Sequence, residues 1–339
     1  MRLLVTGAAG FIGSAYVREV LAARPAGEIV VLDKLTYAGR RENLAEVEDR
    51  IDFRVGAIED PDAVHEAMEG CDAVVNFAAE SHVDRSIAGE EGFAITHVIG
   101  TTVLLEAVRE LGVERYLQVS TDEVYGSIAS GSFTEQSPLD PSSPYSATKA
   151  AGDLLVSAHA HTYGIDAVIC RGSNNYGPRQ YPEKLIPLCV LNALAGDPLP
   201  VYADGRQVRN WLWAEDFARA IDLVLHAGAR GEVYNVGGPD ELENVEVVRR
   251  ILAACGRDES LIEYVRDRPG HDRRYSLSAD KVRALGWEAQ VRFDQGLERT
   301  VAGTATTSGG TRFARASTAS TTSGSTGGRS ARPADSRDF

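Results

Sequence analysis

Two residues with the right types and spacing for acid–base chemistry lie near the middle of the sequence. Tyr145 and Lys149 are expected near the start of a helix, where a spacing of four places both side chains on one face. A phenol acts as a base near neutral pH only when its pKa is lowered, and a nearby ammonium group lowers it. Such pairs also occur on protein surfaces by chance. Thr121 favours the catalytic interpretation, because it follows an apolar stretch and could hydrogen-bond a reacting oxygen.

Two adjacent carboxylates follow Thr121. Asp122 and Glu123 could divide the roles of acid and base if their surroundings differ. Paired acidic residues lie most often in a solvated turn, but these two stand between the threonine and the tyrosine–lysine pair. The sequence therefore predicts one catalytic group, made of Thr121, Asp122, Glu123, Tyr145 and Lys149.

A glycine motif near the N-terminus predicts a dinucleotide-binding turn. Gly7, Gly10 and Gly13 follow the first expected strand and open a helix, so the backbone can approach a pyrophosphate at the helix N-terminus. A plain strand–helix turn could have the same glycines. Asp33 favours the dinucleotide, because it ends the second expected strand about 20 residues later, where a carboxylate binds adenosine ribose hydroxyls.

The same aspartate bears on which dinucleotide binds. Its charge would repel a ribose phosphate, which favours NAD over NADP. The nearby cations Lys34, Arg40 and Arg41 weaken this preference slightly. NAD is the cofactor that the sequence predicts.

Short apolar runs alternate with helical patterns in the first half of the chain. Strands are expected at residues 2–6, 28–32, 51–55, 72–77, 115–119 and 166–170, and helices at residues 13–23, 63–68, 100–111 and 145–163. This alternation indicates βαβ units and an α/β fold with a Rossmann-type, doubly wound parallel sheet.

The amino-acid composition changes at two points along the chain. Residues 1–172 are expected to form mainly the NAD-binding domain. Residues 173–302 have more proline and glycine, and should form mainly a smaller C-terminal lobe that binds substrate, with some strands returning to the sheet. Residues 303–339 contain no Leu, Ile, Val or Met, so we expect a disordered tail.

The net charge, the cysteines and the apolar stretches of the sequence indicate which binding partners and which cellular compartment to expect. The net charge of −14 disfavours binding to nucleic acid or to an anionic membrane surface. The four cysteines lack metal-ligand spacing, so no metal site is expected. The chain begins directly with an expected strand, and no apolar stretch approaches the roughly 20 residues that span a bilayer. A cytoplasmic protein is expected.

Longer motifs resemble those of one enzyme family. The glycine motif combined with the tyrosine–lysine pair is typical of the extended short-chain dehydrogenases/reductases. Within them, residues 1–302 resemble the dTDP-glucose 4,6-dehydratases. Six segments carry the resemblance: residues 33–39, 78–86, 120–126, 174–178, 182–187 and 268–272.

The resemblance implies an NAD-dependent lyase that converts dTDP-glucose to dTDP-4-keto-6-deoxyglucose in three steps. First, Tyr145 takes the proton of the sugar 4-hydroxyl while C4 gives a hydride to NAD⁺. Next, Glu123 removes the acidified C5 hydrogen while Asp122 protonates the departing 6-hydroxyl. Finally, the hydride returns to C6 and C5 regains a proton.

Binding residues also carry over by resemblance. NAD contacts are implied for Gly7, Gly10, Phe11, Ile12, Gly13, Asp33, Lys34, Leu35, Thr36, Ala57, Ile58, Phe77, Ala78, Ala79, Ser81, Thr96, Tyr145, Lys149 and Asn175. Nucleotide-sugar contacts are implied for Ser81, Thr121, Asn174, Lys184, Leu185, Pro200, Val201, Tyr202, Arg209, Asn244, Asp267, Arg268, Pro269, Gly270 and His271. Of these, Lys184 and Arg209 suit a diphosphate, although a lone cation is more often a solvated surface charge.

The sequence departs from the family pattern at three positions. Ala57 stands where the family usually has an Asp that reaches the adenine, so part of the NAD affinity is in question. His97 stands in place of Asn, and we expect it to be a packed or surface residue rather than a ligand. Phe217 stands where the family favours His.

Two other readings remain open. The chain could be another nucleotide-sugar enzyme of the superfamily, an epimerase or a decarboxylase, although these generally lack the adjacent Asp and Glu. It could also be a catalytically silent NAD-binding protein. The resemblance to the dehydratase family also implies a homodimer, in which residues 100–111 and 145–163 pair across a two-fold axis as a four-helix bundle.

The tail also suggests a frameshift. Relatives continue beyond Ala302 into an aromatic-rich helical end that begins Trp-Tyr. Residues 303–312 can be encoded by the codons GGT ACC GCG ACA ACG AGT GGT GGA ACC CGN. One T added in front makes the same nucleotides read Trp-Tyr-Arg-Asp-Asn-Glu-Trp-Trp-Asn-Pro. We therefore predict that one nucleotide is missing from the gene after the codon for Ala302.

Overall fold

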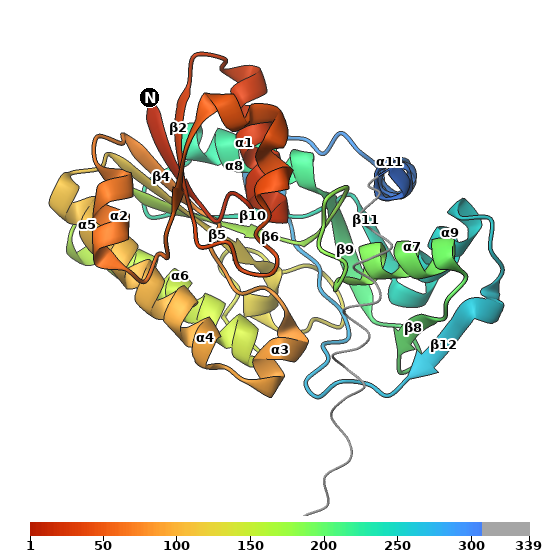
Figure 1. Cartoon of the computed structure of the whole chain (residues 1–339). Coiled ribbons are helices and arrows are strands. Elements are labelled where there is room, and N and C mark those ends of the chain that lie inside the picture. Colours follow the sequence, from red (N-terminus) through yellow and green to blue (C-terminus); the bar gives the residue numbers. More distant parts are fainter. Residues whose placement is uncertain (307–339) are drawn as a thin grey trace, which may run out of the picture.

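The computed structural model describes residues 1–306, and in these the main element is a seven-stranded parallel sheet (Figure 1). Its order is β10-β6-β5-β4-β1-β2-β3. The strands are β1 (Arg2–Thr6), β2 (Glu28–Asp33), β3 (Ile51–Val55), β4 (Ala73–Asn76), β5 (Arg115–Thr121), β6 (Ala167–Gly172) and β10 (Val233–Val236). Most are continuous apolar runs, because helices cover both faces of the sheet. The predicted Rossmann-type fold is confirmed.

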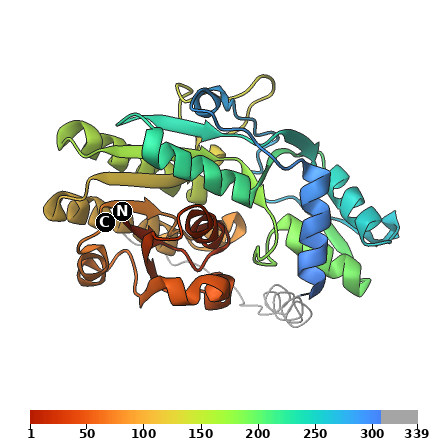
Figure 2. The ribbon, with the colours of Figure 1, turned by 90° about the horizontal axis from the view of Figure 1, so that it is seen from above.

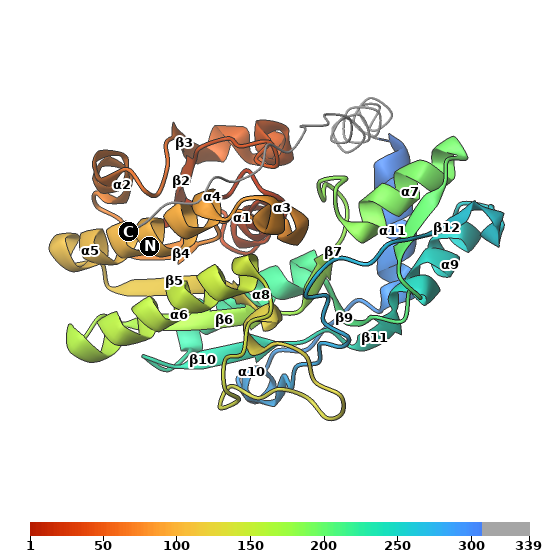
Figure 3. The same cartoon turned by 90° about the horizontal axis from the view of Figure 1, so that it is seen from below.

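Two helical layers cover the sheet, as the views from above and below show (Figures 2 and 3). One face packs against α1 (Phe11–Ala23), η1 (Arg41–Arg50), α8 (Ala214–Ala227) and α10 (Asp280–Ala284). The other packs against α2 (Pro61–Met68), α5 (Thr101–Leu111) and α6 (Pro144–Thr162). Three short segments, α3 (Val83–Ala88), α4 (Glu91–Ala94) and η2 (Ile95–Gly100), lie beside α6.

A smaller lobe has its own aromatic core of Tyr176, Trp211, Trp213 and Phe293. Its helices are α7 (Leu185–Ala195), α9 (Asn244–Ala254) and α11 (Phe293–Thr306), with the short turn η4 (Glu259–Leu261). One small sheet joins β7 (Asn174–Tyr176), β9 (Val208–Trp213) and β11 (Asp240–Glu243), and another joins β8 (Leu199–Tyr202) and β12 (Ile262–Val265).

The two lobes are not separated at a single position in the sequence. Strand β10 pairs with β6, and α8 packs on α1, so both belong to the larger domain although they lie beyond residue 172. Helix α11 continues through residues 303–306, which places the predicted start of the disordered tail too early. The remainder of that tail lies outside the described residues.

One continuous helical run, residues 91–111, joins α4, η2 and α5. It has 21 residues, and its most apolar 18-residue window has a mean hydropathy of 1.2, so by length and composition it could cross a membrane. The expectation that no apolar stretch approaches that length was therefore wrong. Half of its most apolar window is buried within the protein, where Leu104, Leu105 and Val108 belong to the core. Core packing thus accounts for part of its apolar character.

Candidate active site

The candidate active site is a cleft at the carboxyl ends of the parallel strands. It has a volume of about 280 Å³ and opens to solvent. Residues that follow β1, β2, β4 and β5 line it, together with the start of α6 and the segment before α7. This is the edge at which doubly wound sheets bind ligands.

The glycine turn forms one wall of the cleft. Gly7 has a φ of 66°, and a Cβ there would lie 2.6 Å from the backbone nitrogen of Ala78. A Cβ on Gly13 would lie 2.5 Å from the carbonyl oxygen of Gly7, so this glycine lets α1 pack against the turn. Gly10 is the N-cap of α1 and also lines the cleft. The geometry suits a pyrophosphate at a helix N-terminus.

Asp33 lies at the end of β2 beside this turn. Its carboxylate accepts hydrogen bonds from the backbone N–H of Ala9 (2.9 Å) and of Leu35 (2.8 Å). Burial raises the pKa of Asp33, and these two hydrogen bonds oppose the increase. The carboxylate lines the cleft, where ribose hydroxyls could replace part of its lost hydration.

Tyr145 and Lys149 occupy the first turns of α6. The helix begins at a Ser143–Ser146 capping box and at Pro144, which favours initiation at this point. The ammonium of Lys149 donates to the carbonyl oxygen of Val119 at 2.7 Å, which ties α6 to β5. Burial lowers the pKa of Lys149 to about 8, and burial together with the two neighbouring carboxylates raises the pKa of Tyr145.

The two carboxylates follow β5 in the short turn η3 (Asp122–Tyr125). Thr121 caps this turn, since its hydroxyl accepts from the N–H of Glu123 at 3.3 Å. Burial and the adjacent Glu123 raise the pKa of Asp122 to about 8. Burial also raises the pKa of Glu123, but Arg268, Lys184 and Arg209 counteract this effect. The two carboxylates therefore have different surroundings, as an acid and a base would need.

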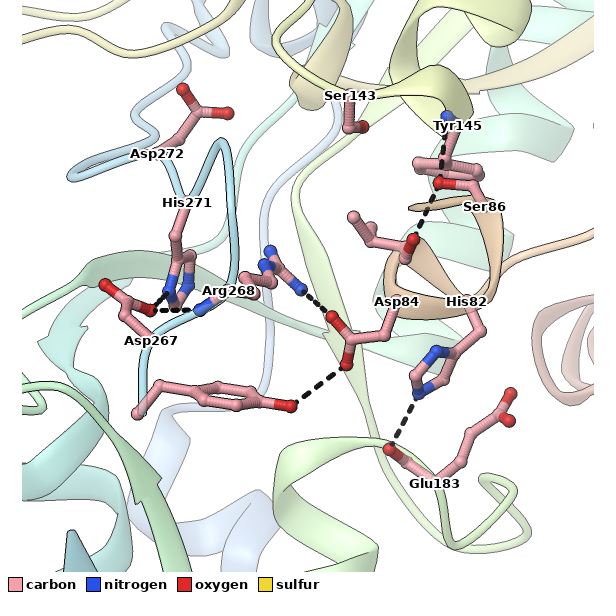
Figure 4. Close-up of polar contacts among 12 residues, drawn as sticks. His82, Asp84, Ser86, Ser143, Tyr145, Glu183, Asp267, Arg268, His271 and Asp272 are labelled. Atoms are coloured by element: carbon pink, nitrogen blue, oxygen red, sulfur yellow. Dashed lines mark hydrogen bonds and ion pairs between the residues drawn. The ribbon is translucent and has the colours of Figure 1, made fainter. Parts of the chain in front are cut away.

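Cations from the smaller lobe approach the carboxylates. The Lys184 ammonium donates to the carbonyl oxygen of Ser81, and Arg209 is buried, donating to the carbonyl oxygen of Asp272 at 3.0 Å. Figure 4 shows Arg268 extending toward Asp84 of α3, at 3.5 Å. This contact joins the two lobes.

Several buried polar atoms on the cleft wall have no hydrogen-bond partner among the described residues. These are Oε2 of Glu59, Oδ2 of Asp122, Oδ1 of Asn174, Oδ1 of Asn175 and Oε1 of Gln180. A buried acceptor without a donor is unfavourable by roughly 1–3 kcal/mol. Their concentration in one cleft fits a site that a polar ligand completes.

The comparisons with known proteins agree with this geometry. A family model described as GDP-mannose 4,6 dehydratase matches residues 4–300. The chain belongs to this family. The resemblance predicted from the motifs is confirmed.

Individual relatives of this 4,6-dehydratase chain are similar over almost their whole length. The chain is 51% identical to the low-salt glycan biosynthesis protein Agl12 of Haloferax volcanii, over 89% of this chain and 97% of that protein. It is 50% identical to a dTDP-glucose 4,6-dehydratase of Streptomyces niveus, over 89% and 92%. Among solved structures, the dTDP-glucose 4,6-dehydratase DesIV of Streptomyces venezuelae, described with NAD bound, has a TM-score of 0.90 and 53% identity, covering 91% of this chain and 98% of that one.

Most residues predicted for the 4,6-dehydratase site lie together. All five predicted catalytic residues line the cleft, as do all the predicted NAD contacts except Leu35 and Ala57. Among the predicted nucleotide-sugar contacts, Ser81, Thr121, Asn174 and Lys184 line it. The others do not, namely Leu185, Pro200, Val201, Tyr202, Arg209, Asn244, Asp267, Arg268, Pro269, Gly270 and His271.

The outer contacts form a neighbouring group in the smaller lobe. The hydroxyl of Tyr202 donates to Asp84 at 3.1 Å, and the rings of Tyr202 and His271 are 5.8 Å apart. His271 in turn lies 2.6 Å from Asp267 (Figure 4). Their roles in binding the nucleotide sugar remain predictions.

The three departures from the 4,6-dehydratase pattern have distinct settings. His97 is buried; its Nδ1 lies 2.8 Å from the hydroxyl of Thr148, and its ring contacts that of Tyr145 at 5.8 Å. Phe217 is buried against Gly172 and lines the cleft. Ala57 does not line it, although both of its neighbours do.

Sequence reasoning missed several residues of the cleft. Ser173 borders the recognised segment 174–178, and Glu183 lies within the recognised segment 182–187, so the motifs could have indicated both. Glu59 directly follows the predicted contact Ile58, and Gln180 and Tyr181 lie between the recognised segments 174–178 and 182–187, so their positions beside these residues were the available signal.

Proposed function

We propose that the chain is an NAD-dependent dTDP-glucose 4,6-dehydratase. The observation that carries this proposal is the pair of carboxylates, Asp122 and Glu123, which share one cleft with Tyr145 and Lys149 but have different charged neighbours. Elimination of water requires an acid and a base together. Relatives with about half of their residues identical carry this name.

The residues at the glycine turn would hold the cofactor. The pyrophosphate would lie at the N-terminus of α1, and the adenosine ribose beside Asp33. NAD supplies the hydride acceptor for C4 and the hydride donor for C6. The space between the glycine turn and Tyr145 is continuous within one cleft, as this transfer requires.

Oxidation at C4 would use the residues at the junction of β5 and α6. Tyr145 accepts the proton of the 4-hydroxyl, and Thr121 hydrogen-bonds the same oxygen. Without the cofactor, burial and the two carboxylates raise the pKa of Tyr145. In this proposal the Lys149 ammonium, held by the carbonyl oxygen of Val119, lowers that pKa when the site is occupied. A positive charge on the bound cofactor would act in the same direction.

Elimination would use the two carboxylates in different protonation states. Asp122, with a pKa of about 8, is protonated at neutral pH and can donate a proton to the leaving 6-hydroxyl. Glu123 faces three cations, which favour its ionised form, so it can accept the C5 proton. The proton taken by Glu123 leaves C5, and the C6–O bond breaks as water forms.

The cations Lys184, Arg209 and Arg268 would bind the diphosphate of the substrate. Permanent or nearly permanent charges suit this role, and the Arg fork suits phosphate oxygens. A nucleotide-sugar epimerase is the second candidate, but it needs no acid–base pair beyond Tyr145, so the buried Asp122 would have no purpose there.

Incubation with dTDP-glucose, UDP-glucose and GDP-mannose, followed by NMR of the products, tests the function. We expect turnover of dTDP-glucose to a 4-keto-6-deoxy sugar with no net use of NAD. In deuterated water one deuteron should appear at C5. A product that keeps its 6-hydroxyl and is inverted at C4 would support an epimerase instead, and absence of turnover with all three would support a silent NAD-binding protein.

We further propose that the protein acts as a cytoplasmic homodimer. Exposed apolar side chains gather on α3, η2 and α6, where Ile87, Ile95, Ile99 and Leu154 are 39%, 39%, 53% and 61% exposed. Such a patch on packed helices suits a two-fold helical interface. Leu154→Glu should dissociate the dimer in analytical ultracentrifugation, whereas Val55→Glu, at an exposed position on β3, should not. A monomeric wild-type protein would refute the dimer.

A further inference from the structure

The cation that directly follows Asp33 is held by other residues. Lys34 directly follows Asp33 and lines the same cleft. Its ammonium donates to Oε1 of Glu59 at 3.2 Å and to the hydroxyl of Thr96 at 3.1 Å, and it pairs with Oε1 of Glu80 at 3.5 Å. An ammonium has three donors, so these three acceptors can occupy all of them.

The two carboxylates come from different parts of the fold. Glu59 follows β3 and lines the cleft, and its second oxygen is buried with no partner among the described residues. Glu80 follows β4, and its side chain is 19% exposed. Thr96, in η2, is fully buried and cannot move aside readily. The position of Lys34 is thus fixed from three elements.

The charge at this end of the cleft is unfavourable for a second phosphate. Asp33, Glu59 and Glu80 carry three negative charges, and Lys34 supplies one positive charge. The other nearby cations also have partners, because Arg40 pairs with Glu42 and Arg41 pairs with Glu48. A ribose 2′-phosphate beside this group would therefore meet three carboxylates and one ammonium whose three donors are already engaged.

We propose that Glu59, together with Glu80, makes the site select NAD over NADP by holding the Lys34 ammonium away from a ribose 2′-phosphate. This inference rests on the proposed NAD cofactor. It makes Glu59 a specificity residue in addition to Asp33. It also predicts that Lys34 does not weaken the preference for NAD, contrary to what its position next to Asp33 in the sequence suggests.

Calorimetry on cofactor-free protein measures the affinities for NAD and NADP in four variants, two that test the inference directly and two that serve as controls. Glu59→Gln should raise the affinity for NADP by about tenfold, since it removes one repulsive charge and releases Lys34. The affinity for NAD should change by less than about threefold. Adenosine 2′,5′-bisphosphate and AMP should show the same contrast, because the effect lies at the adenosine end. Glu80→Gln should act in the same direction.

Two further variants separate the holding of Lys34 from a general effect of charge. Lys34→Met combined with Glu59→Gln should lose the gain in NADP affinity, because no ammonium is then released. Glu66→Gln removes a charge from an 80% exposed position on the adjacent helix α2, and should leave the NADP-to-NAD ratio unchanged. Thermal unfolding of each variant confirms that it is folded.

The possible failures are distinguishable. NAD binding by wild-type protein, with an NADP-to-NAD ratio that Glu59→Gln leaves unchanged, would overturn the inference alone. A gain that survives in the double variant would also overturn it. Absence of NAD binding by the folded wild-type protein would reject the proposed cofactor itself.

Discussion

Asp122→Asn should stop the elimination step while leaving oxidation intact. The carboxyl group is 1% exposed, lies beside Glu123 and Arg209, and has a pKa of about 8. At pH 7 about nine-tenths of the molecules therefore carry the proton that the leaving hydroxyl needs, and at pH 9 only about one-tenth do. Loss of a general acid slows a step by typically about 10²–10⁴-fold.

Stopped-flow absorbance of NADH separates the two steps. In the wild-type protein NADH appears during oxidation of C4 and decays once elimination has occurred. We expect the decay to slow about tenfold for each pH unit above 8, and the slow decay of Asp122→Asn to lack this dependence. Lys149 also has a pKa near 8, but it acts on the appearance of NADH rather than on its decay.

Glu123→Gln is the matched variant at the neighbouring position. It should also accumulate NADH, because the C5 proton has no acceptor. The pH above which the decay of NADH slows should be lower than in the wild-type protein, because a neutral residue 123 no longer raises the pKa of Asp122. A wild-type decay rate that stays constant from pH 7 to 9, or an Asp122→Asn variant with normal decay, would refute the division of roles.

The raised pKa of Asp122 should also affect stability. In the unfolded chain this carboxyl ionises near pH 4, whereas in the folded protein it keeps its proton to about pH 8. The folded state therefore binds the extra proton between these values, and the contribution of this group makes folding less favourable as pH rises through that range. Accordingly Asp122→Asn should be more stable than wild type at pH 9 in urea denaturation, with the difference shrinking toward pH 4.

Three further predictions concern the proposed catalytic base, a buried ion pair and the adenine end of the NAD site. Tyr145→Phe should form no NADH transient, and a transient of normal size would contradict its role as base. Asp153→Asn should lower the unfolding free energy by about 3–5 kcal/mol, because it leaves buried Arg171 without its partner at 2.8 Å, whereas Glu259→Gln, in the exposed pair with Arg249, should change it little. Ala57→Asp should tighten NAD binding in calorimetry by adding an acceptor near the adenine, and unchanged affinity would mean that this position does not reach the cofactor.

The hydrophobic pattern of the sequence was sufficient to predict the bounds of those helices and strands that are long or wholly apolar. The predicted bounds of β1 and β3 agree with the structure, and α1 begins only two residues earlier than expected. Strand β5 extends two residues further, to Thr121, because polar Ser120 and Thr121 are held by pairing with β6 rather than by apolar packing. No local pattern indicates such pairing.

The second half of the chain was harder to predict, for two reasons. Its strands have three to six residues and pair with distant segments, as β7 does with β9. Helix α7 is apolar on nearly all sides and contains Pro187 in its first turn, a position that a helix tolerates. The amphipathic helix α8 had a readable pattern and was missed because the surrounding proline and glycine suggested loops.

The candidate active site likewise has residues that sequence motifs identify and contacts that only the folded structure reveals. Motifs identified the catalytic group, since those residues are close in sequence or one helical turn apart. The contact of Lys34 with Glu59 and Glu80 depends on three strand ends meeting at one edge, and sequence spacing does not reveal it. The pKa difference between Asp122 and Glu123 likewise depends on cations from the smaller lobe.

The predicted frameshift has a consequence that the described part of α11 makes measurable. In the restored frame the gene encodes Trp-Tyr in place of Gly303 and Thr304, directly within this helix. A Cβ at position 303 would lie 3.1 Å from Cβ of Pro178, so a large side chain there would pack on Pro178 after a small shift. Replacing a helical glycine and burying part of an aromatic ring should together raise the unfolding free energy by about 1–3 kcal/mol.

Resequencing the gene tests the frameshift directly, and denaturant unfolding tests its physical consequence. Gly303→Ala is the control, since it improves helix propensity by about 1 kcal/mol at most and adds no aromatic contact. The restored chain should exceed this control in stability. Turnover should be preserved in both chains, because the catalytic residues lie in β5, η3 and α6, away from position 303. A gene without the missing nucleotide would refute the frameshift, and a restored chain no more stable than Gly303→Ala would refute packing against Pro178.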